Sequence, residues 1–153
     1  MSYSKGIYNA IIRFLEDDEW HYTFDEDKEL IRCGVTLKNK LQSCKLLIDL
    51  RDDRYSVFGT IALNVEEGAR DEMAKLITYI NYDIMFGFFE MDYRDGEIRF
   101  RMPVNCADCL PSQDVIRHSM YVPALMLEKY GDAILKVMMG FAYAKDAFDA
   151  VED

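Results

Sequence analysis

The chain has few of the features that mark membrane, secreted or nucleic-acid-binding proteins. Its 153 residues contain no run of about 18 uncharged apolar residues, the length a membrane-spanning helix needs. The first 15 residues lack the basic start and apolar run of a signal peptide. Lys and Arg number 18 against 28 Asp and Glu, and this balance disfavours both nucleic acid and anionic lipid surfaces. We therefore expect a cytoplasmic protein without a nucleic-acid or membrane partner.

Catalytic and cofactor motifs are also scarce. The sequence has no HExxH, GxSxG, GxGxxG or Walker motif, and its four cysteines are too few for a disulfide scaffold. One CxxC pair, Cys106 and Cys109, has only His118 at a plausible spacing for a further zinc ligand. We predict a non-enzymatic protein with no cofactor and no metal. The alternative is a small thiol-redox or zinc-binding protein centred on Cys106, Cys109 and His118, and an enzyme without a recognisable motif ranks last.

Three segments between Leu30 and Asn64 alternate apolar and polar residues with the period of a β-strand. Their apolar positions are Ile31, Cys33, Val35 and Leu37, then Cys44, Leu46, Ile48 and Leu50, then Tyr55, Val57, Ile61 and Leu63. Asp52-Asp53 lies where a two-residue turn would pair Leu50 with Tyr55. The preceding stretch, 16–27, has no clean period, and we predict a loop there.

The stretch Phe89 to Met102 has the pattern of a β-hairpin. Asp95-Gly96 suits a two-residue type I′ turn, which would pair Tyr93 with Ile98 and apolar residues with one another on that face. On the other face the same register pairs Arg94 with Glu97, Asp92 with Arg99 and Glu90 with Arg101. We predict this register because a one-residue slip would turn carboxylates toward the core.

Three helical regions are predicted, at about residues 4–16, 64–81 and 113–145. Ser4, Asn64 and Ser112 stand at their starts and are suitable N-cap residues. Pro123 should break or kink the third region just before itself, which gives two predicted pieces at about 113–121 and 123–145. The predicted fold is one α+β domain spanning 1–153, with element order α-βββ-α-ββ-α. It has a five-stranded, mainly antiparallel sheet and helices packed mostly on one face.

Residues 76–102 carry a family resemblance. A helix ends in a Leu/Ile-x-x-Asn-like segment, a glycine opens the next strand, and Phe-x-x-Asp with Asp-Gly builds the hairpin. The residues concerned are Leu76, Ile80, Asn81, Gly87, Phe89, Asp92, Asp95 and Gly96. This pattern resembles the YbjN-type family of bacterial proteins. The resemblance implies a fold like that of type III secretion chaperones, which are small, acidic, commonly dimeric domains that hold an extended partner segment against the sheet.

The sheet face opposite the predicted core carries three large apolar residues, Leu47, Phe58 and Phe88. If helices cover only one face, burying each against a partner would contribute roughly 1.5–3 kcal/mol before binding costs. The alternative is that the C-terminal helices cover these residues as core. A further apolar group joins that patch or a dimer seam: Tyr82, Met85 and Phe86. We predict a homodimeric, chaperone-like or regulatory module that binds a protein or peptide segment on its sheet face.

Overall fold

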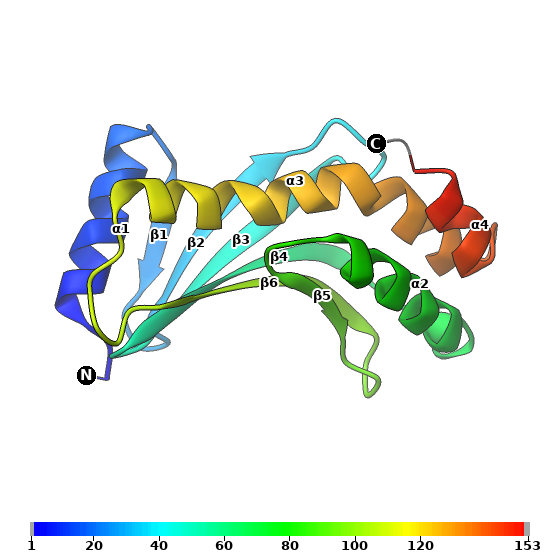
Figure 1. Ribbon diagram of the computed structural model, residues 1–153, viewed down its shortest axis with the longest axis horizontal. Helices are drawn as coiled ribbons and strands as arrows, with labels where there is room; N and C mark the ends of the chain where they lie inside the picture. The colour runs from blue at the N-terminus through cyan, green and yellow to red at the C-terminus, as the bar shows by residue number, and fades with distance from the viewer. Residues whose placement is uncertain (1, 152–153) are drawn as a thin grey trace.

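A six-stranded antiparallel sheet with the order β1-β2-β3-β4-β6-β5 forms the centre of the molecule (Figure 1). The computed structural model describes residues 2–151. Its strands are β1 (Tyr22–Asp25), β2 (Leu30–Thr36), β3 (Ser43–Leu50), β4 (Arg54–Asn64), β5 (Phe88–Met91) and β6 (Glu97–Asn105). Its helices are α1 (Lys5–Asp17), the 3-10 turn η1 (Glu67–Ala69), α2 (Arg70–Asp83), α3 (Gln113–Met138) and α4 (Ala144–Asp149). The α+β class is confirmed, but the sheet has six strands rather than five.

The additional strand is β1, which lies in the segment predicted to be loop. It pairs with β2 at the edge of the sheet, and Phe24 faces Ile31 there. The ring of Phe24 also packs against the rings of Tyr8 and Tyr3, with centroids 4.9 and 5.9 Å apart. The strand is only four residues long, so the alternation of Tyr22 and Phe24 with Thr23 and Asp25 is too short to predict a strand by itself. Pairing and aromatic packing define it instead.

The β3–β4 connection follows the prediction. Leu50 pairs with Tyr55 and Ile48 with Val57, as a two-residue turn at Asp52-Asp53 requires. All four paired residues are fully buried. The apolar alternation and the turn position therefore agreed on one register.

The register of the β5–β6 hairpin differs from the prediction by two residues. Ile98 pairs with Met91 rather than with Tyr93, and Phe100 pairs with Phe89. Tyr93 lies in the turn. Because successive side chains point to opposite faces, a shift of two residues keeps every side chain on its predicted face. The predicted faces are right, although the predicted pairs are wrong.

Contacts from outside the hairpin hold its wider turn. Gly96 has a positive φ of 79°, and its carbonyl accepts a hydrogen bond from Val65 N at 2.8 Å. A Cβ at Gly96 would overlap the Val65 carbonyl. Arg70 Nη1 also donates to the Tyr93 carbonyl, at 3.0 Å. The turn is therefore stabilised by the segment before α2, which the hairpin sequence does not reveal.

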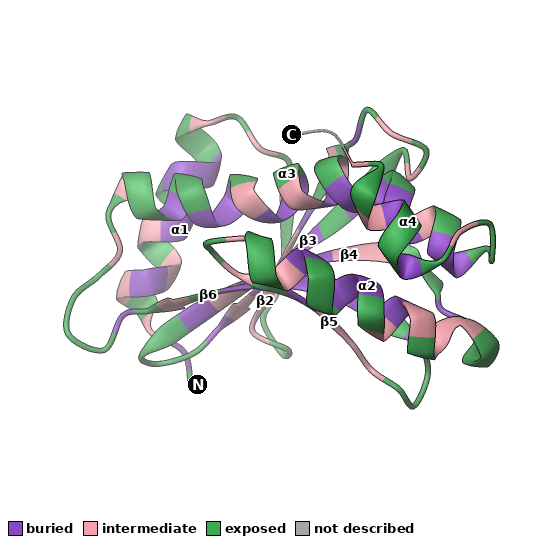
Figure 2. Cartoon of the chain, turned by 45° about the vertical axis from the view of Figure 1, so that its right-hand side comes forward, coloured by how far each residue is buried: buried purple, intermediate pink, exposed green. Residues whose placement is uncertain are grey.

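The second helix begins later than predicted. Asn64 is the last residue of β4 and donates through Nδ2 to the Asp95 carbonyl at 3.2 Å, so it does not cap the helix. η1 intervenes, and α2 starts at Arg70. The predicted apolar stripe is confirmed as its buried side: Met73, Leu76, Ile77 and Ile80. In Figure 2 the buried and exposed residues of α2 are coloured differently along the helix.

The predicted break at Pro123 does not occur. α3 continues through it, and the predicted second piece is the end of α3 followed by α4. Pro123 is buried against β4, where a Cβ at Gly59 would lie 3.2 Å from Pro123 Cβ and 2.9 Å from Leu127 Cδ1. A hydrogen bond of 2.7 Å between the buried hydroxyls of Tyr55 and Ser119 joins the same two elements. This packing offsets the helix-breaking tendency of proline.

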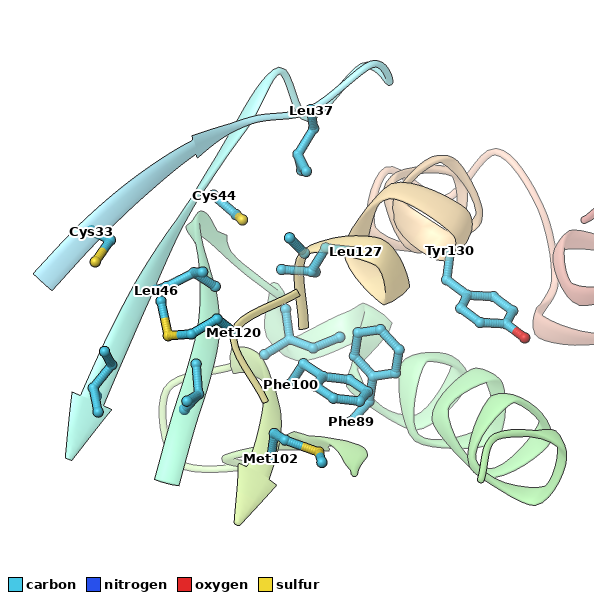
Figure 3. Packing of buried hydrophobic residues seen from close by; sticks show 14 of the residues in the cluster. Cys33, Leu37, Cys44, Leu46, Phe89, Phe100, Met102, Met120, Leu127 and Tyr130 are labelled. Carbon is cyan, nitrogen blue, oxygen red and sulfur yellow. The ribbon is translucent and has the colours of Figure 1, made fainter. Parts of the chain in front are cut away.

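The core lies between the sheet and the helices. Met120 and Leu127 of α3 point toward Leu46 on β3, and Phe89 packs edge-on against Phe100 at 5.0 Å (Figure 3). The predicted N-caps Ser4 and Ser112 are confirmed, since each hydroxyl accepts a backbone hydrogen bond of 3.1 Å in the first turn. Apart from Phe58, the buried residues of the described strands all belong to this face of the sheet.

Candidate functional site

The second face of the sheet, here called the open face, is exposed or half-buried at almost every position. It consists of the strand residues that alternate with the core residues. Its central part is made by Lys45, Leu47, Asp49, Ser56, Phe58, Thr60, Phe88, Glu90, Arg99 and Arg101.

The three predicted apolar residues of this face lie in one cross-strand row. Leu47 pairs with Phe58, Phe58 with Arg101, and Arg101 with Phe88, so the row crosses β3, β4, β6 and β5 in sequence. Leu47 is half-buried, Phe58 is 9% exposed and Phe88 is 37% exposed. The structure therefore brings these residues together, with an arginine between the two rings. We refer to Leu47, Phe58, Arg101 and Phe88 as the apolar row.

Two arginines cover Phe58. The guanidinium carbons of Arg99 and Arg101 lie 4.1 and 5.0 Å from the centre of its ring. Such cation–π contacts contribute about 0.5–2 kcal/mol each, depending on how far the pair is desolvated. Phe58 is thus shielded by side chains of its own sheet face. The Phe58 ring and the two guanidinium groups therefore form one stacked cluster.

Glu90 holds both arginines in place. Its Oε1 accepts hydrogen bonds from Arg99 Nε at 2.7 Å and from Arg101 Nε at 2.9 Å. Burial acts to raise the pKa of Glu90, but the hydrogen bonds from the two arginines outweigh it and lower the pKa. The carboxylate is therefore ionised at neutral pH, and the predicted Asp92–Arg99 pair is replaced by this shared carboxylate.

The second predicted apolar group lies at the end of α2 and in the loop before β5. Tyr82 is 91% exposed, Met85 88% and Phe86 56%. The Phe86 ring packs edge-on against the His118 ring of α3, with centroids 4.7 Å apart. Phe86 therefore lies beside α3, whereas Phe88 belongs to the open face.

The residues of the alternative thiol or zinc centre, Cys106, Cys109 and His118, form no metal-binding cluster within residues 2–151. Cys106 is buried at the end of β6, where its N–H donates to the Asp53 carbonyl at 2.8 Å, and burial raises the pKa of its thiol. Cys109 is exposed, and all four cysteines are free thiols. Among residues 2–151 no group of three or more His, Cys, Asp and Glu side chains is arranged to hold a metal ion.

Sequence reasoning placed Arg99 and Arg101 on the open face but missed their stacking on Phe58. The missed signal was the alternation of arginines around Phe100, on a strand that could lie beside Phe58. β6 pairs with β4, which is distant in sequence. The hairpin pattern alone therefore could not predict that Arg99 and Arg101 lie beside Phe58.

Comparison with known proteins gives one positive result. No curated protein matches the chain significantly. No helix within the described residues has both the length and the apolarity to cross a membrane. The model of the YbjN family, described as "Putative bacterial sensory transduction regulator", matches residues 8–136, which include most of α1, all six strands, α2 and most of α3. The chain therefore belongs to the YbjN family.

Proposed function

We propose that this protein is a non-enzymatic regulatory module that holds an extended segment of a partner protein on its open face. The observation that supports the proposal is the apolar row, which lies on a sheet face where every described strand residue except Phe58 is exposed or half-buried. The description of the family as a transduction regulator agrees with a role in protein binding. A chaperone-like action, in which the partner segment is kept extended, fits the same surface.

The open face offers a partner both apolar and charged contacts. The half-buried Leu47 and the exposed Phe88 supply apolar surface on either side of the stacked arginines. Because Glu90 fixes both guanidinium groups, a partner would order few side chains on binding, and this lowers the entropic cost. A segment with apolar residues and a carboxylate near Arg99 would complement this surface.

Substitution at Phe88 tests the proposal. The tagged protein is used to purify partners from a native extract, the main partner is produced recombinantly, and its affinity is measured by calorimetry. We expect Phe88→Glu to weaken binding by at least about tenfold, or about 1.4 kcal/mol. Tyr143→Glu is the matched control, since Tyr143 is an exposed aromatic residue just before α4. Equal affinities for both variants and the wild type would exclude the open face as the binding site.

We also propose that the protein is a homodimer whose seam includes Tyr82, Met85 and Phe86. Three large apolar side chains within five positions, each more than half exposed, support this assignment. Size-exclusion chromatography with light scattering should show a dimer for the wild type and a monomer for Met85→Glu. A wild type that stays monomeric at high concentration would refute the seam.

A further inference from the structure

The sheet opens between β3 and β4 at one end. Pairing of these strands stops at Lys45 and Thr60, although β4 continues to Asn64. On its other side β4 shifts register, from the Thr60–Arg99 pair to the Asn64–Glu97 pair. Within the described chain, the segment 61–63 therefore has no paired residue in β3 and lies outside the regular ladder with β6. A stretch of strand is left beside a gap.

The gap exists because α3 draws the β2–β3 hairpin away from β4. Asn39 at the hairpin tip donates through Nδ2 to the carbonyls of Leu127 and Glu128, at 2.9 and 3.0 Å. Lys38 N donates to the Glu128 carboxylate at 2.9 Å. In Figure 1 the loop that joins β2 and β3 lies beside the second half of α3. Gly131 permits this approach, because a Cβ there would overlap Asn39 Nδ2.

Apolar side chains line the gap, which we call the wedge. Its apolar lining includes Leu41, Leu47, Ile61 and Leu63, its charged lining residues are Lys45 and Glu97, and it encloses about 320 Å³. This volume is at the lower end of the range for ligand pockets. Leu63 is 40% exposed, so the apolar wall is accessible from solvent. The wedge has room for one large apolar side chain and is bordered by the β4 segment 61–63, which has no paired residue in β3.

We propose that the wedge receives an extended segment of the partner protein, which adds as a short strand beside residues 61–63. One apolar side chain of that segment inserts between Leu41 and Leu63, and an acidic residue next to it faces Lys45. The proposal rests on the proposed function, since Leu47 belongs to both the wedge and the apolar row and a bound segment continues from one to the other. Strand addition explains why main-chain groups, rather than a set of convergent polar side chains, border the site.

A random dodecapeptide phage library tests the wedge without knowledge of the natural partner. Peptides are selected on the wild type alone, and the recovered sequences are made with a fluorescent label. Fluorescence polarisation then gives affinities for the wild type, Leu63→Glu, Phe88→Glu and the control Tyr143→Glu. We expect Leu63→Glu to weaken binding at least tenfold, and Tyr143→Glu to leave it unchanged. Recovered peptides should have an apolar residue next to an acidic one.

Hydrogen exchange adds a readout that a merely structural defect does not give. Amides of residues 61–63 should exchange more slowly when the peptide is bound. Failure to recover any peptide that prefers the wild type over Leu63→Glu would overturn the proposal. So would peptides that lose binding only with Phe88→Glu, an outcome that leaves the open face as the binding site. Concentration-dependent protection of these amides without peptide would assign the wedge to a second copy and would also overturn it.

Discussion

Replacement of Gly131 by alanine should reverse its effect on stability depending on whether Asn39 is present. Gly131 is a buried position inside α3, where alanine is favoured over glycine by about 1 kcal/mol of helix propensity. A Cβ at this position would overlap Asn39 Nδ2 and lie 2.7 Å from Leu41 Cδ1. The Leu41 methyl group can move aside at little cost. The Asn39 amide cannot, because two hydrogen bonds to helix carbonyls hold it.

The two opposing contributions can be compared directly. Each hydrogen bond from Asn39 Nδ2 contributes about 0.5–1.5 kcal/mol, so displacing the amide costs about 1–3 kcal/mol. After the gain in helix propensity, Gly131→Ala in the wild type should lower the free energy of unfolding by up to about 2 kcal/mol. In an Asn39→Ala background only Leu41 must move, so Gly131→Ala should raise that free energy by up to about 1 kcal/mol.

Urea unfolding of the wild type, both single variants and the double variant measures this coupling. We expect an interaction energy of about 1–3 kcal/mol from urea unfolding. In thermal unfolding of the same variants, each kcal/mol should shift the melting temperature by about 2–4 °C. If Gly131→Ala has the same effect in both backgrounds, the hairpin tip is not held on α3 by Asn39. The hydrogen bonds between Asn39 and α3 would then not explain the gap between β3 and β4.

Three further predictions concern electrostatics, thiols and the sheet edge. The pKa of Glu90 is lower in the folded chain than its ordinary value of 4.5, so its stabilisation is complete above that pH and is lost as pH falls through the folded pKa. The difference in melting temperature between wild type and Glu90→Gln should therefore shrink below about pH 4.5, and a constant difference would contradict the salt bridges. Cys109 is the only exposed cysteine, so Ellman's reagent at about pH 8 should react quickly with one thiol per chain. Cys109→Ser should abolish this fast reaction, and two fast-reacting thiols in the wild type would contradict the burial of the other three cysteines. The Asn81 side chain donates to the Phe89 carbonyl at 3.0 Å and accepts from its N–H at 2.8 Å, which occupies the free edge of β5. Asn81→Ala should destabilise the fold by about 1–3 kcal/mol in urea and promote self-association in light scattering, whereas unchanged behaviour would show that this edge needs no protection.

Part of the candidate site could be predicted from the sequence because side-chain alternation is a local property. The period of two placed Leu47, Phe58 and Phe88 opposite the core, and each lies there. The same period explains why the hairpin prediction assigned the right faces but the wrong pairs. A shift of two residues leaves the alternation unchanged, so the pattern cannot distinguish between the two registers.

The sequence by itself determined which residues form strands and helices over most of the chain, where Ser4 and Ser112 cap helices, and which strand side chains point inward. Only the tertiary structure decided how β4 meets β6, how Pro123 remains within a helix, and how the hairpin tip binds α3. These features depend on contacts between segments far apart in the chain, such as Gly59 with Pro123 and Asn39 with Leu127. Local periodicity contains no information about such contacts, because their free energy arises only when the segments pack together.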